Sequence, residues 1–146
     1  MFKKAKWHKA VKKAKTKRQK LTKQLDDLWS LVVRQRANHT CIKCGRVTIL
    51  GSGNAMNAHH FIGKSSRNTR WDLNNGICLC AGCHRMKTDA AHRQPEKFKK
   101  WAIDKYGEEW YENIIIKGNQ IRKWTIPELE ELLKEFKEEI KEIQYE

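Results

Sequence analysis

The sequence contains no run of about 18 apolar residues, so it has no segment that could span a membrane. Its lysine-rich N-terminus lacks the apolar stretch of a secretory signal, and no segment is repeated along the chain. We therefore expect an intracellular, cytoplasmic protein with no membrane partner. A length of 146 residues suits one domain with a modest core.

Acidic residues are scarce, because 17 Asp and Glu stand against 31 Lys and Arg and leave a formal net charge of +14. Residues 1–23 contain eleven Lys or Arg and no acid, whereas residues 127–146 contain eight Glu and three Lys. A basic arm and centre are typical of proteins that bind a phosphate backbone, and they predict DNA as the partner. A solvated tail is the alternative interpretation of the arm.

Apolar periodicity and turn residues predict an α+β fold. Helices are expected over residues 2–38, 81–90, 95–106, 108–116 and from about 126 onward, with short strands over 57–62 and 76–79. Thr125 and Glu128 fit a capping box at the start of the last helix. We divide the chain into a basic arm (1–23), a domain (24–126) with a motif core (41–90), and a C-terminal amphipathic helix (127–146). That helix is expected to pack near Leu25, and a homodimer seam is the alternative.

The five cysteines are an odd number, and a disulfide framework would not need the regular spacing that four of them show. Four of them form two CxxC pairs, Cys41/Cys44 and Cys80/Cys83, a spacing that suits a structural Zn²⁺ held by thiolates in a reducing compartment. Unrelated buried thiols are the alternative. Cys78 is left over, and we expect a small buried hydrophobe there, with a role as a substitute ligand as the second interpretation.

Three histidines stand near these pairs. His59 and His60 are neighbours on a predicted strand, so their side chains should point to opposite sides, and each can take a different role. His84 directly follows the second CxxC pair on a predicted helix. A strand histidine facing a helix histidine makes a two-ligand site that suits catalytic Mg²⁺ or Mn²⁺, although imidazole also binds Zn²⁺ and Ni²⁺. His92 is expected at the surface or as a cap, or else near this site.

The residues Ala58-His59-His60, Asn75 and Cys80-x2-Cys83-His84, framed by Cys41-x2-Cys44, together resemble the HNH nuclease family. The resemblance implies a small zinc-stapled ββα-metal core embedded in helices. It implies that His59 and His84 bind the catalytic ion and that His60 is the general base that activates water. It also implies that Asn75 orients His60 by tying down the loop between the strands. The products implied are a 5′-phosphate and a 3′-hydroxyl.

The layout outside this core resembles the phage NinG/Rap recombination nucleases. The shared features are a lysine-rich helical arm, an amphipathic helix before the first cysteine pair, and Lys123-Trp124-Thr125-Ile126 at the last helix. The resemblance implies a metal-dependent endonuclease that hydrolyses DNA phosphodiester bonds. Nicked or branched recombination intermediates are the substrates that it suggests.

Five basic residues near the motif are candidates for holding DNA phosphates: Lys64, Arg67, Arg70, Arg85 and Lys87. Such contacts position a substrate without reading its sequence, and simple solvation is the alternative for each. Trp71 is expected in the core rather than as a platform for bases. The alternative function is a non-catalytic zinc-finger module that binds nucleic acid. Such a module needs the four paired cysteines but has no use for the histidines and Asn75 in register.

Overall fold

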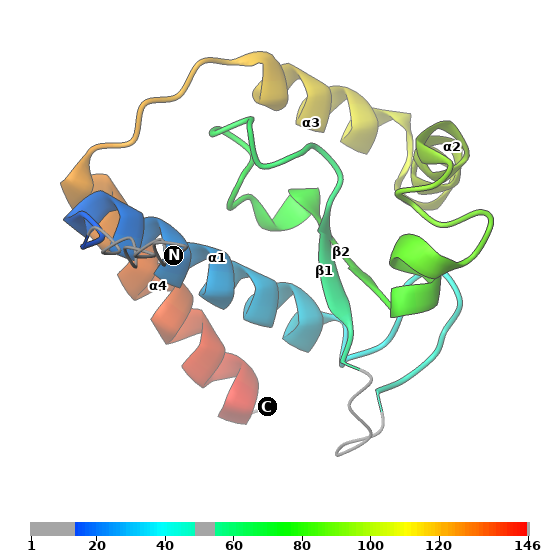
Figure 1. The fold of residues 1–146 in the computed structure, drawn as a ribbon, viewed down its shortest axis with the longest axis horizontal. Helices are drawn as coiled ribbons and strands as arrows, with labels where there is room; N and C mark the ends of the chain where they lie inside the picture. Colours follow the sequence, from blue (N-terminus) through cyan, green and yellow to red (C-terminus); the bar gives the residue numbers. More distant parts are fainter. Residues whose placement is uncertain (1–13, 49–54, 146) are drawn as a thin grey trace, which may run out of the picture.

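The computed structural model describes residues 14–48 and 55–145, which fold into helices around a two-stranded sheet (Figure 1). The elements are α1 (Lys17–Arg36), β1 (Asn57–His60), the 3₁₀ turn η1 (Leu73–Asn75), β2 (Gly76–Leu79), the π-helical turn η2 (Gly82–Met86), α2 (Pro95–Tyr106), α3 (Glu108–Asn119) and α4 (Ile126–Tyr145). In Figure 1, α1 and α4 lie on one side of the sheet, and α2 and α3 lie on the other. The α+β class is therefore confirmed.

Helix α1 begins at Lys17, which is later than the helix predicted over residues 2–38. The Thr16 hydroxyl accepts the Gln19 N–H at 3.2 Å, and the Gln19 side chain accepts the Thr16 N–H at 3.0 Å. This capping box starts the helix, because both groups satisfy free backbone donors. Residues 1–13 lie outside the described residues. The helix ends where predicted, since Asn38 and His39 have positive φ angles.

The strands β1 and β2 pair antiparallel, with His59 opposite Ile77 and His60 opposite Gly76. Strand β2 has the predicted bounds, whereas β1 ends two residues earlier than expected. Gly76 lies against α1, because a Cβ atom there would stand 2.4 Å from Cγ2 of Val33. The absence of a side chain therefore lets the sheet approach α1 closely.

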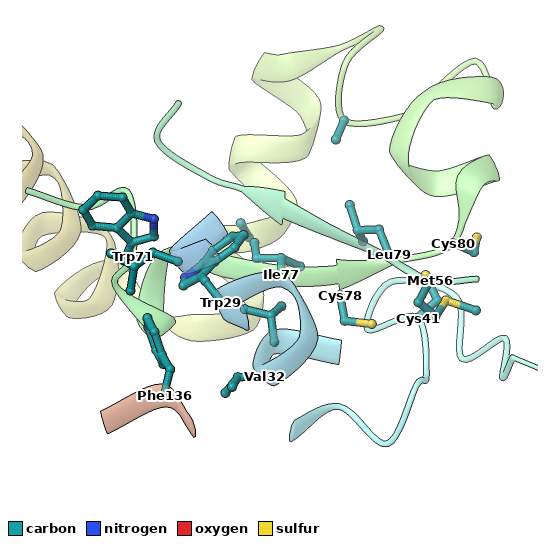
Figure 2. Packing of buried hydrophobic residues seen from close by; sticks show 14 of the residues in the cluster. Trp29, Val32, Cys41, Met56, Trp71, Ile77, Cys78, Leu79, Cys80 and Phe136 are labelled. Atoms are coloured by element: carbon teal, nitrogen blue, oxygen red, sulfur yellow. The ribbon is translucent and has the colours of Figure 1, made fainter. Parts of the chain in front are cut away.

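The predicted packing of the last helix on α1 is confirmed. Leu25 of α1 and Leu129 of α4 are both buried, at 0% and 1% exposed. The Glu128 N–H donates to the Thr125 hydroxyl at 3.4 Å, and the Glu128 carboxylate accepts the Thr125 N–H at 2.7 Å, which confirms the capping box. Figure 2 shows Phe136 of α4 and Trp29 of α1 in the shared core.

The chain after β2 departs from the prediction in one place that matters for the site. Helix α2 has the predicted bounds, and α3 continues to Asn119 instead of 116. The helix predicted over 81–90 is replaced by the five-residue turn η2, because the Lys87 N–H closes a wide turn onto the Gly82 carbonyl at 2.9 Å. Within residues 14–48 and 55–145, no helix combines the length and the apolar character needed to cross a membrane.

Candidate metal centres and active site

The four paired cysteines converge into one cluster, in which all Sγ atoms lie within 4.8 Å of one another. The Sγ atoms of Cys44 and Cys80, one from each pair, are 3.7 Å apart. Zinc–sulfur bonds of about 2.3 Å in a tetrahedron place neighbouring sulfurs about 3.8 Å apart. The cluster therefore fits a structural metal such as zinc.

The backbone brings the two pairs together. The first pair sits in a tight turn in which the Gly45 N–H donates to the Cys41 carbonyl at 2.8 Å, and Gly45 has a φ of +71° that favours glycine. The Ile42 N–H then donates to the Cys78 carbonyl at 3.0 Å, which attaches this turn to β2 just before Cys80. Cys78 itself is 1% exposed and is not a member of the cluster, so it is the buried hydrophobe that we expected.

The thiols of the cluster differ in their local electrostatics. Burial raises the pKa of the Cys83 thiol to about 12, so this thiol retains its proton unless a divalent cation competes for the sulfur. The Arg46 backbone N–H lowers the pKa of Cys44 to about 7. The Lys87 ammonium lies 3.7 Å from the Cys83 sulfur. Lys87, a predicted phosphate contact, therefore lies beside the thiols.

A second cluster consists of three histidines, one more than the sequence predicted. His59, His84 and His92 bring a ring nitrogen each to within 4.8 Å of the others. The Nε2 atoms of His84 and His92 are 3.0 Å apart. The rings of His59 and His84 lie edge to face, with their centroids 5.2 Å apart. Three ring nitrogens this close together could hold a metal ion.

His92 reaches the cluster because the chain turns back after η2. The Ala91 N–H donates to the Cys83 carbonyl at 2.9 Å, and the His92 N–H donates to the His84 carbonyl at 3.1 Å. Had the helix continued through residue 90, His92 would have lain roughly two turns away from His84. No spacing rule in the sequence links His84 to His92. Only the alternative that placed His92 near the site anticipated this contact.

Burial keeps the imidazoles of His59 and His84 neutral. Desolvation, and then the nearby His84 and His92, lower the pKa of His59 to about 3. Desolvation, and then His92, lower the pKa of His84 to about 4. A neutral imidazole offers a nitrogen lone pair, and three of them suit Zn²⁺, Mn²⁺ or Ni²⁺ better than Mg²⁺, which prefers oxygen ligands.

His60 points away from the histidine cluster, as expected for neighbours on a strand. Its ring stacks on Trp29 with centroids 3.8 Å apart, and its Nε2 lies 2.8 Å from the Arg70 carbonyl oxygen. Because a carbonyl only accepts, Nε2 carries the proton and Nδ1 retains a lone pair. Burial lowers the pKa of His60, and the bond to Arg70 opposes that shift. His59, His60 and His92 all line one cavity of about 470 Å³.

Asn75 holds the loop between the strands. Its side chain is fully buried and accepts the Ile62 N–H at 2.6 Å. Its amide donates to the Ile62 carbonyl at 2.9 Å and to the Thr69 carbonyl at 3.0 Å. Both amide N–H groups and the amide oxygen are thus bonded to the backbone of the loop that contains Arg70, whose carbonyl binds His60.

With this geometry in hand, we compared the chain with known proteins. A family model described as bacteriophage lambda NinG protein matches residues 2–146, which is nearly the whole chain. The chain belongs to the bacteriophage lambda NinG family. Membership of the NinG family indicates a phage recombination-related role. The searches of curated proteins and of solved structures gave no match.

In this NinG-family chain, the predicted phosphate contacts separate into two groups. Arg70 donates two hydrogen bonds to Asp26, at 2.9 and 2.7 Å, and Lys64 lies 3.8 Å from the same carboxylate. Arg67 is exposed nearby, and its carbonyl accepts the Trp124 indole N–H at 2.9 Å. These residues lie on the His60 side, whereas Arg85 and Lys87 follow His84. Sequence reasoning missed Asp26, because nothing in α1 marks it as the partner of Arg70.

Proposed function

We propose that this chain is a metal-dependent HNH endonuclease that hydrolyses DNA phosphodiester bonds. The observation that carries the proposal is the cavity that His60 shares with His59 and His92. His60, whose Nδ1 is free, therefore borders the same opening as two members of the three-nitrogen cluster. The HNH resemblance assigns His60 to the general base and His59 and His84 to the metal ligands, and His92 joins them in the cluster. The β1–β2–η2 succession around them supports a ββα-metal core.

The residues divide the chemistry between them. His60 takes a proton from water at Nδ1, and the water oxygen forms a bond to phosphorus while the bond from phosphorus to the 3′ oxygen breaks. The products are a 5′-phosphate and a 3′-hydroxyl. The Arg70 carbonyl stabilises the imidazolium that results, because its bond to Nε2–H strengthens as the ring becomes positive. Asn75 maintains the loop that presents this carbonyl.

The histidine cluster would hold the catalytic ion through His59, His84 and His92. A divalent ion there, when bound, supplies positive charge to the phosphate oxygens and to the leaving oxygen. Lys64 and Arg67 are exposed on the His60 side, and Arg85 is exposed beside His84. These side chains are placed to hold phosphates that flank the scissile one.

The test is cleavage of supercoiled and branched DNA with added Mn²⁺, Ni²⁺ or Mg²⁺, with His60→Ala beside the wild-type chain. General-base removal costs about 10²- to 10⁴-fold in rate, while binding should be retained. His39→Asn is the matched control, because it replaces a histidine at the end of α1 away from the cavity. Cleavage by His60→Ala at the wild-type rate would remove His60 from the mechanism. Binding without cleavage by the wild-type chain would favour the zinc-finger module.

A further inference from the structure

A second concave site lies between the start of α1, the loop before Trp71 and the start of α4. Its volume is about 610 Å³. Five basic side chains line it, against a single acidic one, Asp26: Lys15, Arg18, Lys23, Arg67 and Arg70. Asp26 is bound by Arg70 and by the Trp71 indole N–H, and Lys23 pairs with Asp27 at 2.5 Å, so Lys15, Arg18 and Arg67 supply the excess positive charge of the groove. We call this site the tryptophan groove.

The interior of the groove is aromatic. Trp71, Trp124 and Leu129 line it together with the basic side chains; Trp71 belongs to the core, as expected, and Trp124 is half-buried. The Trp124 ring is held in place, since its indole N–H donates to the Arg67 carbonyl at 2.9 Å and the Arg122 guanidinium lies 4.3 Å from its centroid. The Arg18 guanidinium donates to the Trp124 carbonyl at 2.8 Å. The groove therefore presents a fixed indole rather than one that must be ordered by a ligand.

The combination identifies the ligand chemistry. A site for duplex phosphates alone needs positive charge but no apolar interior, because paired bases are stacked inside the helix. Basic side chains around the fixed, half-buried indole of Trp124 suit a strand whose bases are free to stack while its phosphates meet the cations. Lys15 and Arg67 have no carboxylate within ion-pairing distance among the described residues, so both charges are available.

The groove also connects to His60. Arg70 lines the groove with its side chain, and its carbonyl oxygen binds Nε2 of His60 at 2.8 Å. One residue thus borders the groove and the proposed general base. We propose that the tryptophan groove binds an unpaired DNA strand and leads it toward His60. The second half of this statement rests on the proposed nuclease function, and the first half does not.

The experiment measures binding in the His60→Ala background, so that cleavage plays no part. Fluorescence anisotropy compares a labelled single strand of about 12 nucleotides with a duplex that carries the same number of phosphates. The groove variants are the double substitution Lys15→Ala with Arg67→Ala, and Trp124→Ala beside the conservative Trp124→Phe. Lys97→Ala with Lys137→Ala is the matched control, because it removes two exposed charges from α2 and α4.

We expect the double groove variant to lose about tenfold in affinity for the single strand, with a salt slope smaller by about 0.7 for each lost contact. Trp124→Ala should lose about tenfold, and Trp124→Phe should retain most of the binding. Circular dichroism of each variant verifies the fold. An equal loss for the duplex, or an equal loss in the Lys97 and Lys137 control, would overturn the proposal. Residual cleavage by His60→Ala with groove-dependent binding intact would refute only the nuclease mechanism.

Discussion

The ring of His60 lies flat against the indole of Trp29, with centroids 3.8 Å apart and an interplanar angle of 17°. Trp29 is 1% exposed, and its indole N–H donates to the Asp72 carbonyl at 3.0 Å. The indole is therefore fixed by the core and cannot rotate away from the imidazole. Helix α1, outside the motif, supplies one wall of the site around the proposed general base.

Two substitutions of Trp29 can separate its stacking on His60 from its hydrogen bond to the Asp72 carbonyl. Trp29→Ala opens a large cavity and should cost about 3–5 kcal/mol of the free energy of unfolding. Trp29→Phe retains an aromatic surface for His60 but loses the bond to Asp72, and it should cost about 1–2 kcal/mol. Urea denaturation measures both values. The NMR signals of the His60 ring should keep their ring-current shift in Trp29→Phe and lose it in Trp29→Ala; identical signals in both would contradict the stacked arrangement.

Gly76 should tolerate no side chain. A Cβ atom there would lie 2.4 Å from Cγ2 of Val33 and 2.9 Å from Cζ2 of Trp29, so either α1 or β2 must shift. Gly76→Ala should therefore destabilise the chain by about 1–3 kcal/mol in urea denaturation. Gly63→Ala is the control, because nothing lies within 4 Å of its added Cβ. Equal stability of the two variants would show that the sheet does not approach α1 as described.

The zinc content of the protein should depend on the four clustered cysteines and should not depend on Cys78. Cys80→Ser removes one of four converging sulfurs, so the variant should lose the bound zinc and most of its stability. Cys78→Ala should keep the zinc, since Cys78 is buried beside the cluster and outside it. Elemental analysis and thermal denaturation of both variants measure these outcomes. Zinc loss from Cys78→Ala alone would assign the site to a different set of thiols.

Local rules predicted much of the fold from the sequence. The bounds of α2 follow from Pro95 and Gly107, and those of β2 from a short apolar run, because these features act through neighbouring residues. The early end of η2 depends on bonds from Ala91 to Cys83, which couple segments that local propensity treats separately. The predicted ligand set did not include His92 for the same reason, because these tertiary hydrogen bonds turn the chain back toward His84. The contact between Trp29 and His60 could not be predicted from the sequence, because it depends on how α1 packs on the sheet.

The stability of the chain should fall in acid because two buried histidines stay neutral. The folded pKa values of His59 and His84, about 3 and about 4, lie below the ordinary 6.5. Between pH 6.5 and about 3 the unfolded chain binds more protons, so the contribution of the two histidines is complete above pH 6.5 and is lost as the pH falls toward about 3. We expect the melting temperature of protein carrying zinc only at the cysteines to drop in this range. His84→Asn should flatten the dependence, and His39→Asn should not; a flat wild-type profile would contradict the buried neutral state.

A His92 substitution tests whether the histidine cluster binds a divalent ion through three nitrogens. In protein already loaded with zinc at the cysteines, His92→Ala should weaken Ni²⁺ or Mn²⁺ binding about 10- to 100-fold, as measured by isothermal titration calorimetry. The side chain of His92 is exposed, so this substitution should leave the thermal stability nearly unchanged. Arg93→Ala is the control, because Arg93 is the exposed neighbour on the same turn. Mg²⁺ should bind weakly to both variants and to the wild-type chain, since all three donors are imidazoles. Unchanged Ni²⁺ affinity in His92→Ala would reduce the site to His59 and His84, the pair that the sequence predicted.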